Sequence, residues 1–352
     1  MKATRLALPD FYKESNAQDP NYQPDKSILM SAAGEWVKRF NLKPVGGDKL
    51  KIFMLCVDNQ RDFSFPQGSL YVGGRSGNGA MDDQDRLAKF IYTNLGLITQ
   101  IICTLDTHLP FQIFHPLAHL KADDSFADAH TIIKDYRDSG LRPNPAMAVQ
   151  LGVSPTWLQR QFIYYCDQLV LRNPDQSLYI WPFHCLIGEP GHALAGVVEK
   201  ARLFHSMARG AANIPEIKGG NPLTEHYSIF RPEVMTLWDG KPIPGAQKNA
   251  KLLETLMLAD VVVIVGQAKS HCMAASIGDF LTEILAKDPE LAKKVYLVED
   301  CTSSVVVPGV VDFTDMADQT FQKFADAGMN LVVSTESIET WPGMAEKLAK
   351  VA

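Results

Sequence analysis

Polar side chains of the kinds that do chemistry follow four of the apolar runs in the chain, the runs 51–57, 97–105, 178–181 and 261–266. In chain order, these runs lead into Asp58, into Asp106 and His108, into His184, and into Cys272. In an open α/β sheet, ligands bind beyond the carboxyl ends of the strands. If the runs are strands, we expect the five side chains to gather at one edge of a sheet.

Cys272 stands where the loop 266–271 gives way to a segment with helical spacing. The positive end of a helix lowers the pKa of a thiol toward the reactive thiolate. The free backbone N–H groups at that end can also hold an oxyanion. The alternative is that Cys272 is a small buried apolar residue. Asp58, after a neighbouring strand, favours the nucleophile because it supplies a base.

Asp106 and His108 lie two residues apart in an extended segment, so their side chains point to the same side. His184 follows a Trp-Pro turn and could supply a third ligand. One carboxylate and two imidazoles with open positions suit zinc, or iron or manganese. An Asp-x-His pair is also common as a surface pair, and the spacing alone leaves that alternative open.

Short β-branched runs alternate with segments of helical spacing along most of the chain. The predicted strands are 51–57, 97–105, 178–181, 261–266, 295–298 and 330–334, and the predicted helices are 82–94, 193–213, 272–286, 314–327 and 341–351. Apolar runs without alternation suit a sheet covered on both faces. We therefore predict a three-layer α/β/α sandwich with a mainly parallel sheet.

Two stretches do not follow this alternation of strands and helices. Residues 1–49 are polar and contain proline, and we expect an N-terminal extension lying on the surface or on a neighbouring subunit. Residues 109–177 are too long for a normal crossover, so they are predicted to be an insertion in a single domain of residues 50–352. Inside the insertion, Ser154 and Pro155 predict the start of a helix.

The composition excludes several classes of protein. Lys and Arg total 34 against 40 Asp and Glu, a net charge of -6, which argues against binding to nucleic acid or to an anionic membrane surface. No apolar run is long enough to span a membrane, and the first residues do not read as a secretory signal. Six cysteines are too sparse for a disulfide scaffold, so we expect reduced thiols in a cytoplasmic protein.

Blocks of residues around these positions resemble the isochorismatase-like cysteine hydrolases and, within them, the nicotinamidases. The blocks occur in the order of the family between about residues 50 and 340; they are 57–63 with 68–70, 104–108, 181–185, 217–220 with 227–230, 266–272, and 300–304. The resemblance implies the three-layer fold of that family. It also implies a hydrolase that acts on a linear amide bond.

The resemblance assigns roles residue by residue. It implies a catalytic triad of Asp58, Lys218 and Cys272, oxyanion-hole N–H groups from Ala268 and Cys272, metal ligands Asp106, His108 and His184, and substrate contacts from Phe63, Trp181 and Gln267. It implies a cis peptide between Gln267 and Ala268 as well. The other five cysteines are expected to pack in the core or beside the site.

The chain departs from the family pattern at several points. Thr107 stands where an aromatic residue is common, and the segment 188–192 replaces a Gly-Thr and Gly-Ala pattern. His115 lies near where some relatives place a fourth metal ligand, but its spacing leaves that role open. His271 is either a polar pocket residue or a solvated residue at the helix start.

The sequence leaves three hypotheses for the function, two with the same hydrolytic chemistry and one without catalysis. The first is hydrolysis of nicotinamide to nicotinate and ammonia, in the salvage of pyridine nucleotides. The second is the same cysteine chemistry on a carbamoyl, ureide or other amide compound, which the insertion and the altered segment 188–192 favour. The third is a non-catalytic binding or scaffold relative. The expected partners are a small amide and, through the aromatic residues of the insertion, a second copy of the chain.

Overall fold

The structure is a computed structural model, and it describes residues 5–174 and 176–351. Its helices are α1 Lys26–Phe40, α2 Arg61–Ser64, α3 Gly79–Thr93, α4 Pro145–Leu151, α5 Pro155–Arg172, α6 Gly196–Arg209, α7 Ala250–Leu258, α8 Ala274–Lys287, α9 Thr314–Asp326 and α10 Met344–Ala349. Its strands are β1 Ile52–Val57, β2 Gln100–Asp106, β3 His119–Leu120, β4 Ile132–Ile133, β5 Arg142–Pro143, β6 Leu178–Tyr179, β7 Glu216–Lys218, β8 Val261–Gly266, β9 Val295–Val298, β10 Val306–Val307, β11 Val311–Asp312 and β12 Asn330–Val332.

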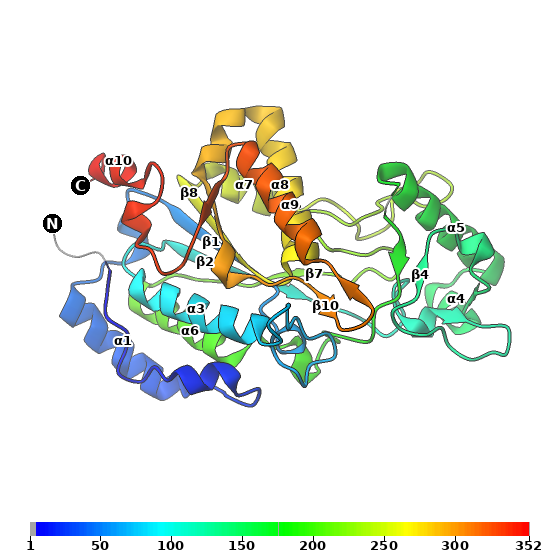
Figure 1. The fold of residues 1–352 in the computed structure, drawn as a ribbon, viewed down its shortest axis with the longest axis horizontal. Helices are drawn as coiled ribbons and strands as arrows, with labels where there is room; N and C mark the ends of the chain where they lie inside the picture. Colours follow the sequence, from blue (N-terminus) through cyan, green and yellow to red (C-terminus); the bar gives the residue numbers. More distant parts are fainter. Residues whose placement is uncertain (1–4, 175, 352) are drawn as a thin grey trace.

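The main sheet has six strands in the order β12-β9-β8-β1-β2-β7, and every neighbouring pair is parallel. Helices α3 and α6 cover one face, and α7, α8 and α9 cover the other (Figure 1). Successive strand residues serve the two faces in turn: Met54 and Cys56 join the first core, while Leu55 and Val57 join the second. The predicted three-layer α/β/α sandwich is confirmed.

One predicted strand of this sheet is wrong, and one strand was missed. Residues 178–181 do not join the sheet, because β6 pairs antiparallel with β4 in a separate two-stranded sheet. The sixth position is taken by β7, which pairs with β2 at the edge. An edge strand of three residues, two of them charged, lacks the apolar run that marks a buried strand.

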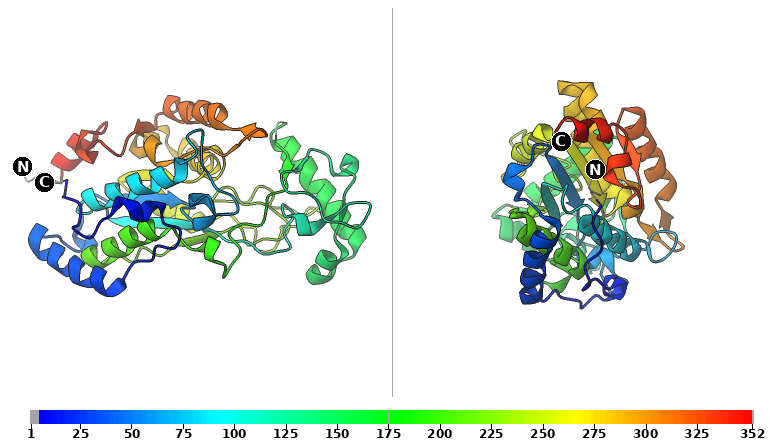
Figure 2. Two further views of the ribbon diagram at one scale, coloured as in Figure 1. Left: turned by 60° about the horizontal axis from the view of Figure 1, so that its bottom comes forward. Right: turned by 90° about the vertical axis from the view of Figure 1, so that its left-hand side faces the viewer.

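The N-terminal segment contains a helix that the sequence did not predict. Asp25 caps α1 by accepting hydrogen bonds from the backbone N–H groups of Ser27 and Ile28. Leu29 and Trp36 are buried in the same core as α3 and α6. The segment therefore packs on the domain as an additional helical layer outside α6 (Figure 2).

The insertion forms a lobe at one end of the molecule, with α4 and α5 on its outer side (Figure 1). Ser154 caps α5 and Pro155 opens it, as predicted, and Cys166 is buried on that helix. The lobe has its own apolar core, to which the loop between β7 and α7 adds Leu223 and Val234. The lobe is thus built from two segments, and the second one begins directly after Lys218, the last residue of β7.

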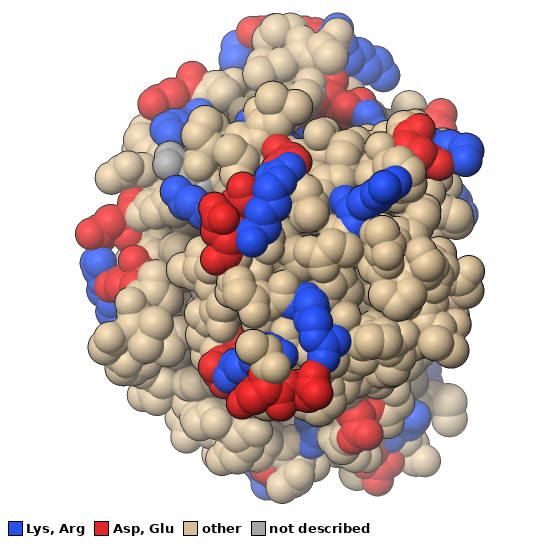
Figure 3. All heavy atoms as spheres, turned by 90° about the vertical axis from the view of Figure 1, so that its right-hand side faces the viewer, with Lys and Arg blue, Asp and Glu red and all other residues tan. Residues whose placement is uncertain are grey.

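The outer face of this lobe carries charges of both signs side by side, as the described surface in Figure 3 shows. On the insertion, Arg137 pairs with Asp135 and Asp167, and Lys121 pairs with Asp128. None of the helices in the described part of the chain is both long and apolar enough to cross a membrane.

Candidate active site

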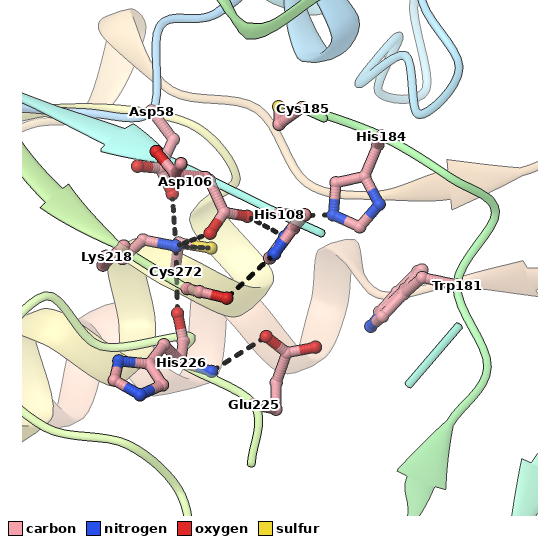
Figure 4. A network of polar contacts seen from close by, with 12 residues as sticks. Asp58, Asp106, His108, Trp181, His184, Cys185, Lys218, Glu225, His226 and Cys272 are labelled. Atoms are coloured by element: carbon pink, nitrogen blue, oxygen red, sulfur yellow. Dashed lines mark hydrogen bonds and ion pairs between the residues drawn. The ribbon is translucent and has the colours of Figure 1, made fainter. Parts of the chain in front are cut away.

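Four neighbouring strands bring the predicted site residues to one edge of the sheet. Asp58 follows β1, Asp106 ends β2, and Lys218 ends β7. Cys272 lies in the π-helical turn Lys269–Met273 that follows β8. Because these strands are parallel and adjacent, their carboxyl ends meet, and the four side chains converge in Figure 4.

Lys218 is the centre of the cluster. Its Nζ lies 2.9 Å from Oδ2 of Asp58 and 2.9 Å from Oδ1 of Asp106. It donates a hydrogen bond of 2.9 Å to the carbonyl of His226, and it lies 3.6 Å from Sγ of Cys272. A fully buried ammonium thus joins both carboxylates to the thiol.

The charges of the cluster hold one another in the ionised state. Burial alone would lower the pKa of Lys218, but Asp106 and Asp58 keep it well above its usual value. Burial alone would raise the pKa of Asp106, but His108 and Lys218 hold it well below its usual range. Removing either the ammonium or the carboxylates would leave the opposite charge buried without a partner.

The pKa of the Cys272 thiol is shifted in the opposite direction to the one predicted. Burial raises the pKa of the thiol well above its usual range, and the nearby Lys218 does not offset this. The expected lowering by a helix N-terminus is therefore wrong, because Cys272 sits inside a buried turn with two carboxylates close by. Carboxylate oxygens of Asp58 and Asp106 and the sulfur of Cys272 all lie within 4.8 Å of one another. The thiol needs a base, and the cluster supplies one.

Asp58 is placed to be that base. Its backbone has φ 45°, in the left-handed region, as the chain turns out of β1. Its carboxylate accepts a hydrogen bond from the Thr104 hydroxyl, and that hydroxyl accepts one from the Asp58 N–H. Burial raises the pKa of Asp58, and Lys218 opposes the rise.

The turn before Cys272 fits tightly against β1. The peptide between Gln267 and Ala268 is cis, as predicted. Gly266 has φ 121°, and a Cβ there would lie 2.0 Å from the carbonyl oxygen of Val57, so only glycine fits. Ala268 and Cys272 both line the cavity, where their N–H groups could meet an oxyanion. Gln267 points elsewhere: its amide donates to Asp83 and accepts from the N–H of Ser303.

Asp106, His108 and His184 form a compact donor set. Their ligand atoms lie within 4.8 Å of one another, with Nε2 of His108 2.9 Å from Asp106 Oδ2 and Nε2 of His184 3.7 Å from it. The Nδ1 atoms face backbone carbonyls, of Gly219 for His108 and of Pro182 for His184. This orientation leaves both Nε2 atoms to a metal, as in typical imidazole ligands. His184 reaches the set from the loop after β6, not from a strand of the main sheet.

His115 stays outside this donor set. Its ring centroid lies 5.5 Å from that of His108, and its Nδ1 bonds to the carbonyl of Leu109. Its Nε2 is buried without a hydrogen-bond partner among the described residues. The group of ligand atoms within 4.8 Å of one another does not include it.

One small cavity joins the thiol to the donor set. It is lined by Phe63, Leu70, Val72, Asp106, Trp181, His184, Glu225, Tyr227, Ala268, His271, Cys272 and Val305. Phe63 and Trp181, the predicted substrate contacts, both lie in its wall. His271 is a pocket residue, with its ring against Trp181, Tyr227 and Phe313.

Glu225 and Tyr227 were not predicted as site residues. Tyr227 lies in one of the matching sequence blocks, but no role was attached to it. Glu225 stands in the irregular loop after β7, where no periodicity shows which way a side chain points.

Known proteins resemble this chain in fold and not in sequence. No protein-family model matches the chain, and no curated protein matches it. The yeast nicotinamidase Pnc1p, solved with the inhibitor nicotinaldehyde, is similar with a TM-score of 0.50 and 16% identity over 80% of this chain and 99% of that one. An Acinetobacter baumanii nicotinamidase has a TM-score of 0.47 and 17% identity, over 82% of this chain and 98% of that one. An N-carbamoylsarcosine amidase from Thermoplasma acidophilum has a TM-score of 0.39 and 14% identity, over 82% of this chain and 99% of that one. The likeness to Pnc1p shows a shared fold.

Proposed function

We propose that the protein is a metal-dependent cysteine amidohydrolase that converts a small carboxamide to an acid and ammonia, with nicotinamide as the first candidate substrate. The observation that carries the proposal is the cluster in one cavity of the Cys272 thiol, the Lys218 ammonium and the Asp58 carboxylate. The shared fold with a yeast nicotinamidase supports it. With nicotinamide, the reaction would supply nicotinate for NAD salvage in the cytoplasm.

The first half of the reaction forms a thioester. Asp58 takes the proton of the Cys272 thiol, and the sulfur attacks the amide carbonyl. Lys218 stabilises the negative charge that moves between carboxylate and sulfur. The N–H groups of Ala268 and Cys272 receive the oxyanion; one such donor is typically worth about 2.7–4 kcal/mol of barrier height. Asp58 then returns its proton to the nitrogen as the C–N bond breaks and ammonia leaves.

The second half releases the acid. Asp58, again a carboxylate, takes a proton from a water molecule, and the water oxygen attacks the thioester carbonyl. The C–S bond breaks, the thiol regains its proton, and the carboxylic acid departs. Each full cycle consumes one amide and one water and returns all three triad residues to their starting state.

Asp106, His108 and His184 would hold the divalent metal, for which zinc fits best and iron or manganese would also fit. The fit rests on the donor set itself: burial lowers the pKa of His108, which keeps it neutral, and Asp106 stays ionised. When bound, a metal would polarise and orient a polar atom of the substrate. The cysteine, carboxylate and lysine carry out the bond changes.

A carbamoyl or ureide compound is the second candidate substrate. Glu225 favours it, because this carboxyl adds a polar group to the lining beside Trp181 and Tyr227. A non-catalytic scaffold is disfavoured, since Asp58, Lys218 and Cys272 are all in place and within contact distance.

Ammonia release from a panel of amides tests the proposal. The panel contains nicotinamide, benzamide and N-carbamoylsarcosine, and the metal content of the protein is measured by elemental analysis. We expect turnover of at least one amide by the metal-loaded protein, loss on chelation, and recovery when zinc is restored. Cys272→Ala should abolish turnover, while Cys166→Ala, a buried thiol of the outer lobe, should retain it. Full activity of Cys272→Ala would exclude the cysteine mechanism.

A further inference from the structure

Glu225 places a carboxyl group in the wall of the cavity, in the loop that follows β7. The residue is 5% exposed and lines the cavity together with Cys272 and Trp181. In Figure 4 its carboxyl lies on the side of the site away from Asp58. The proposed reaction gives this group no task.

The carboxyl is only half satisfied by the protein. Oε1 accepts a hydrogen bond of 2.8 Å from the N–H of His226. Oε2 has no hydrogen-bond partner among residues 5–174 and 176–351, and no cation of these residues forms an ion pair with it. Lys218 is occupied by Asp58 and Asp106. Burial raises the pKa of Glu225 to about 8, and the charge of Asp106 adds to the rise.

A polar atom that lines a largely enclosed cavity is stabilised when a bound molecule gives it a hydrogen-bond partner. Oε2 of Glu225 would gain its partner from a molecule in the cavity. Among the described lining residues, Nε1 of Trp181 already donates to the hydroxyl of Tyr227 at 2.9 Å, and that hydroxyl makes no hydrogen bond to Oε2. Phe63, Leu70 and Val72 contribute only apolar side chains to the lining.

We propose that Glu225 is a specificity-determining residue that hydrogen-bonds a polar group of the substrate away from the amide that Cys272 attacks. The proposal rests on the proposed function, and it names the substrate class: small amides with a ring nitrogen, to which the carboxyl donates in its protonated form, or with an amino, hydroxyl or second carbamoyl group. Hydrocarbon amides of the same size lack a partner for Oε2 and are poorer substrates. A site built to hydrogen-bond its substrate rejects an analogue without that group strongly.

Paired substrates and paired variants test this assignment. Nicotinamide and benzamide differ by one ring nitrogen, and N-carbamoylsarcosine carries a second polar group. We expect Glu225→Leu to lower kcat/KM for the polar substrates by about 10–100-fold while changing benzamide by less than about 3-fold. Glu225→Gln keeps a hydrogen-bonding group of the same shape and should retain most of the preference. Glu254→Leu, at an exposed position of α7, is the control.

The same variants separate this proposal from the proposed function. If the wild-type protein hydrolyses none of the amides, the proposed function fails, and binding of nicotinamide and benzamide is measured by calorimetry instead. Preferential binding of nicotinamide that Glu225→Leu abolishes would still support the role of Glu225. An equal loss of kcat/KM or affinity for polar and hydrocarbon amides would overturn it, as would an unchanged preference in a variant whose thermal unfolding is normal.

Discussion

Lys218 is the residue on which the charge balance of the site depends. Its ammonium is buried between the carboxylates of Asp58 and Asp106. In Lys218→Met these carboxylates would repel each other in a medium that screens them poorly. Removing one partner of a buried ion pair typically costs about 3–5 kcal/mol of the free energy of unfolding. We expect that loss in chemical denaturation, together with at least a 100-fold lower kcat/KM, about 2.7 kcal/mol of transition-state stabilisation.

Lys294→Met is a matched control for that variant. Lys294 is also buried, but it donates to the carbonyls of Leu256, Met257 and Ala259 at the end of α7, far from the site in the fold. This control should lose stability and keep its kcat/KM. Normal stability and rate in Lys218→Met would contradict the described charge balance.

The pKa of the Asp58 carboxyl should set the acid limb of the pH–rate profile. The mechanism needs its carboxylate, and burial raises its pKa above the ordinary value of 3.8. The value of kcat/KM should therefore fall as the pH drops through a pKa above 3.8. In Lys218→Met the limb should move to higher pH, because the stabilising cation is gone. Metal content is measured at each pH, since protonation of the ligands also releases metal. A limb at or below the ordinary value would exclude Asp58 as the base.

The turn after β7 packs against Asp106 and His108, two of the proposed metal ligands. Gly219 has φ 90°, and a Cβ there would lie 2.5 Å from Oδ1 of Asp106 and 2.9 Å from Cε1 of His108. Gly219→Ala should displace these ligands and lower metal affinity by about 10–100-fold, as seen when supporting contacts of metal ligands are lost. Elemental analysis after dialysis against a weak chelator measures the effect.

Gly220→Ala is the neighbouring control. A Cβ at Gly220 would meet only the carbonyl of Thr107, at 3.9 Å, which is an ordinary contact. This variant should bind metal as the wild-type protein does. Equal metal content in the two variants would show that the close approach at Gly219 is unimportant.

The sequence predicted those elements that carry an apolar run or a helical period. Predicted segments overlap strands β1, β2, β8, β9 and β12 and helices α3, α6, α8, α9 and α10, although β2, α3 and α8 extend beyond the predicted bounds by one to three residues. β7 was not predicted as a strand because three residues with two charges carry no period. Residues 178–181 have an apolar run but pair locally with β4, and only tertiary structure decides between the two sheets.

Much of the candidate site could be located from sequence because parallel strands bring their carboxyl ends together. Asp58, Asp106 and Cys272 follow from strand ends, whereas Lys218 came from the family resemblance alone. Glu225 and Tyr227 could not be found, since a long loop folds onto the insertion and its side chains follow no period. The direction of the Gln267 side chain depends on its hydrogen bond to Asp83, which lies on α3.

At the scale of the whole molecule, the N-terminal helix is part of the domain core. Trp36 is 6% exposed and packs against Phe204 of α6, with ring centroids 5.2 Å apart. Trp36→Ala should lower the free energy of unfolding by about 3–5 kcal/mol. Because α1 lies outside α6, away from the cavity, KM should not change. Met30→Ala, 66% exposed on the same helix, should leave both quantities unchanged. An equal effect of the two substitutions would contradict the packing of α1.

The central claim is that Cys272 carries the acyl group of the substrate during turnover. The direct test is acid quench during hydrolysis of an amide from the panel, followed by mass spectrometry of the intact protein and its peptides. The account predicts a species heavier by the acyl group, with the added mass on the peptide that contains Cys272. It predicts no such species in Cys272→Ala. Acylation of any other residue, or the same adduct in Cys272→Ala, would contradict the account.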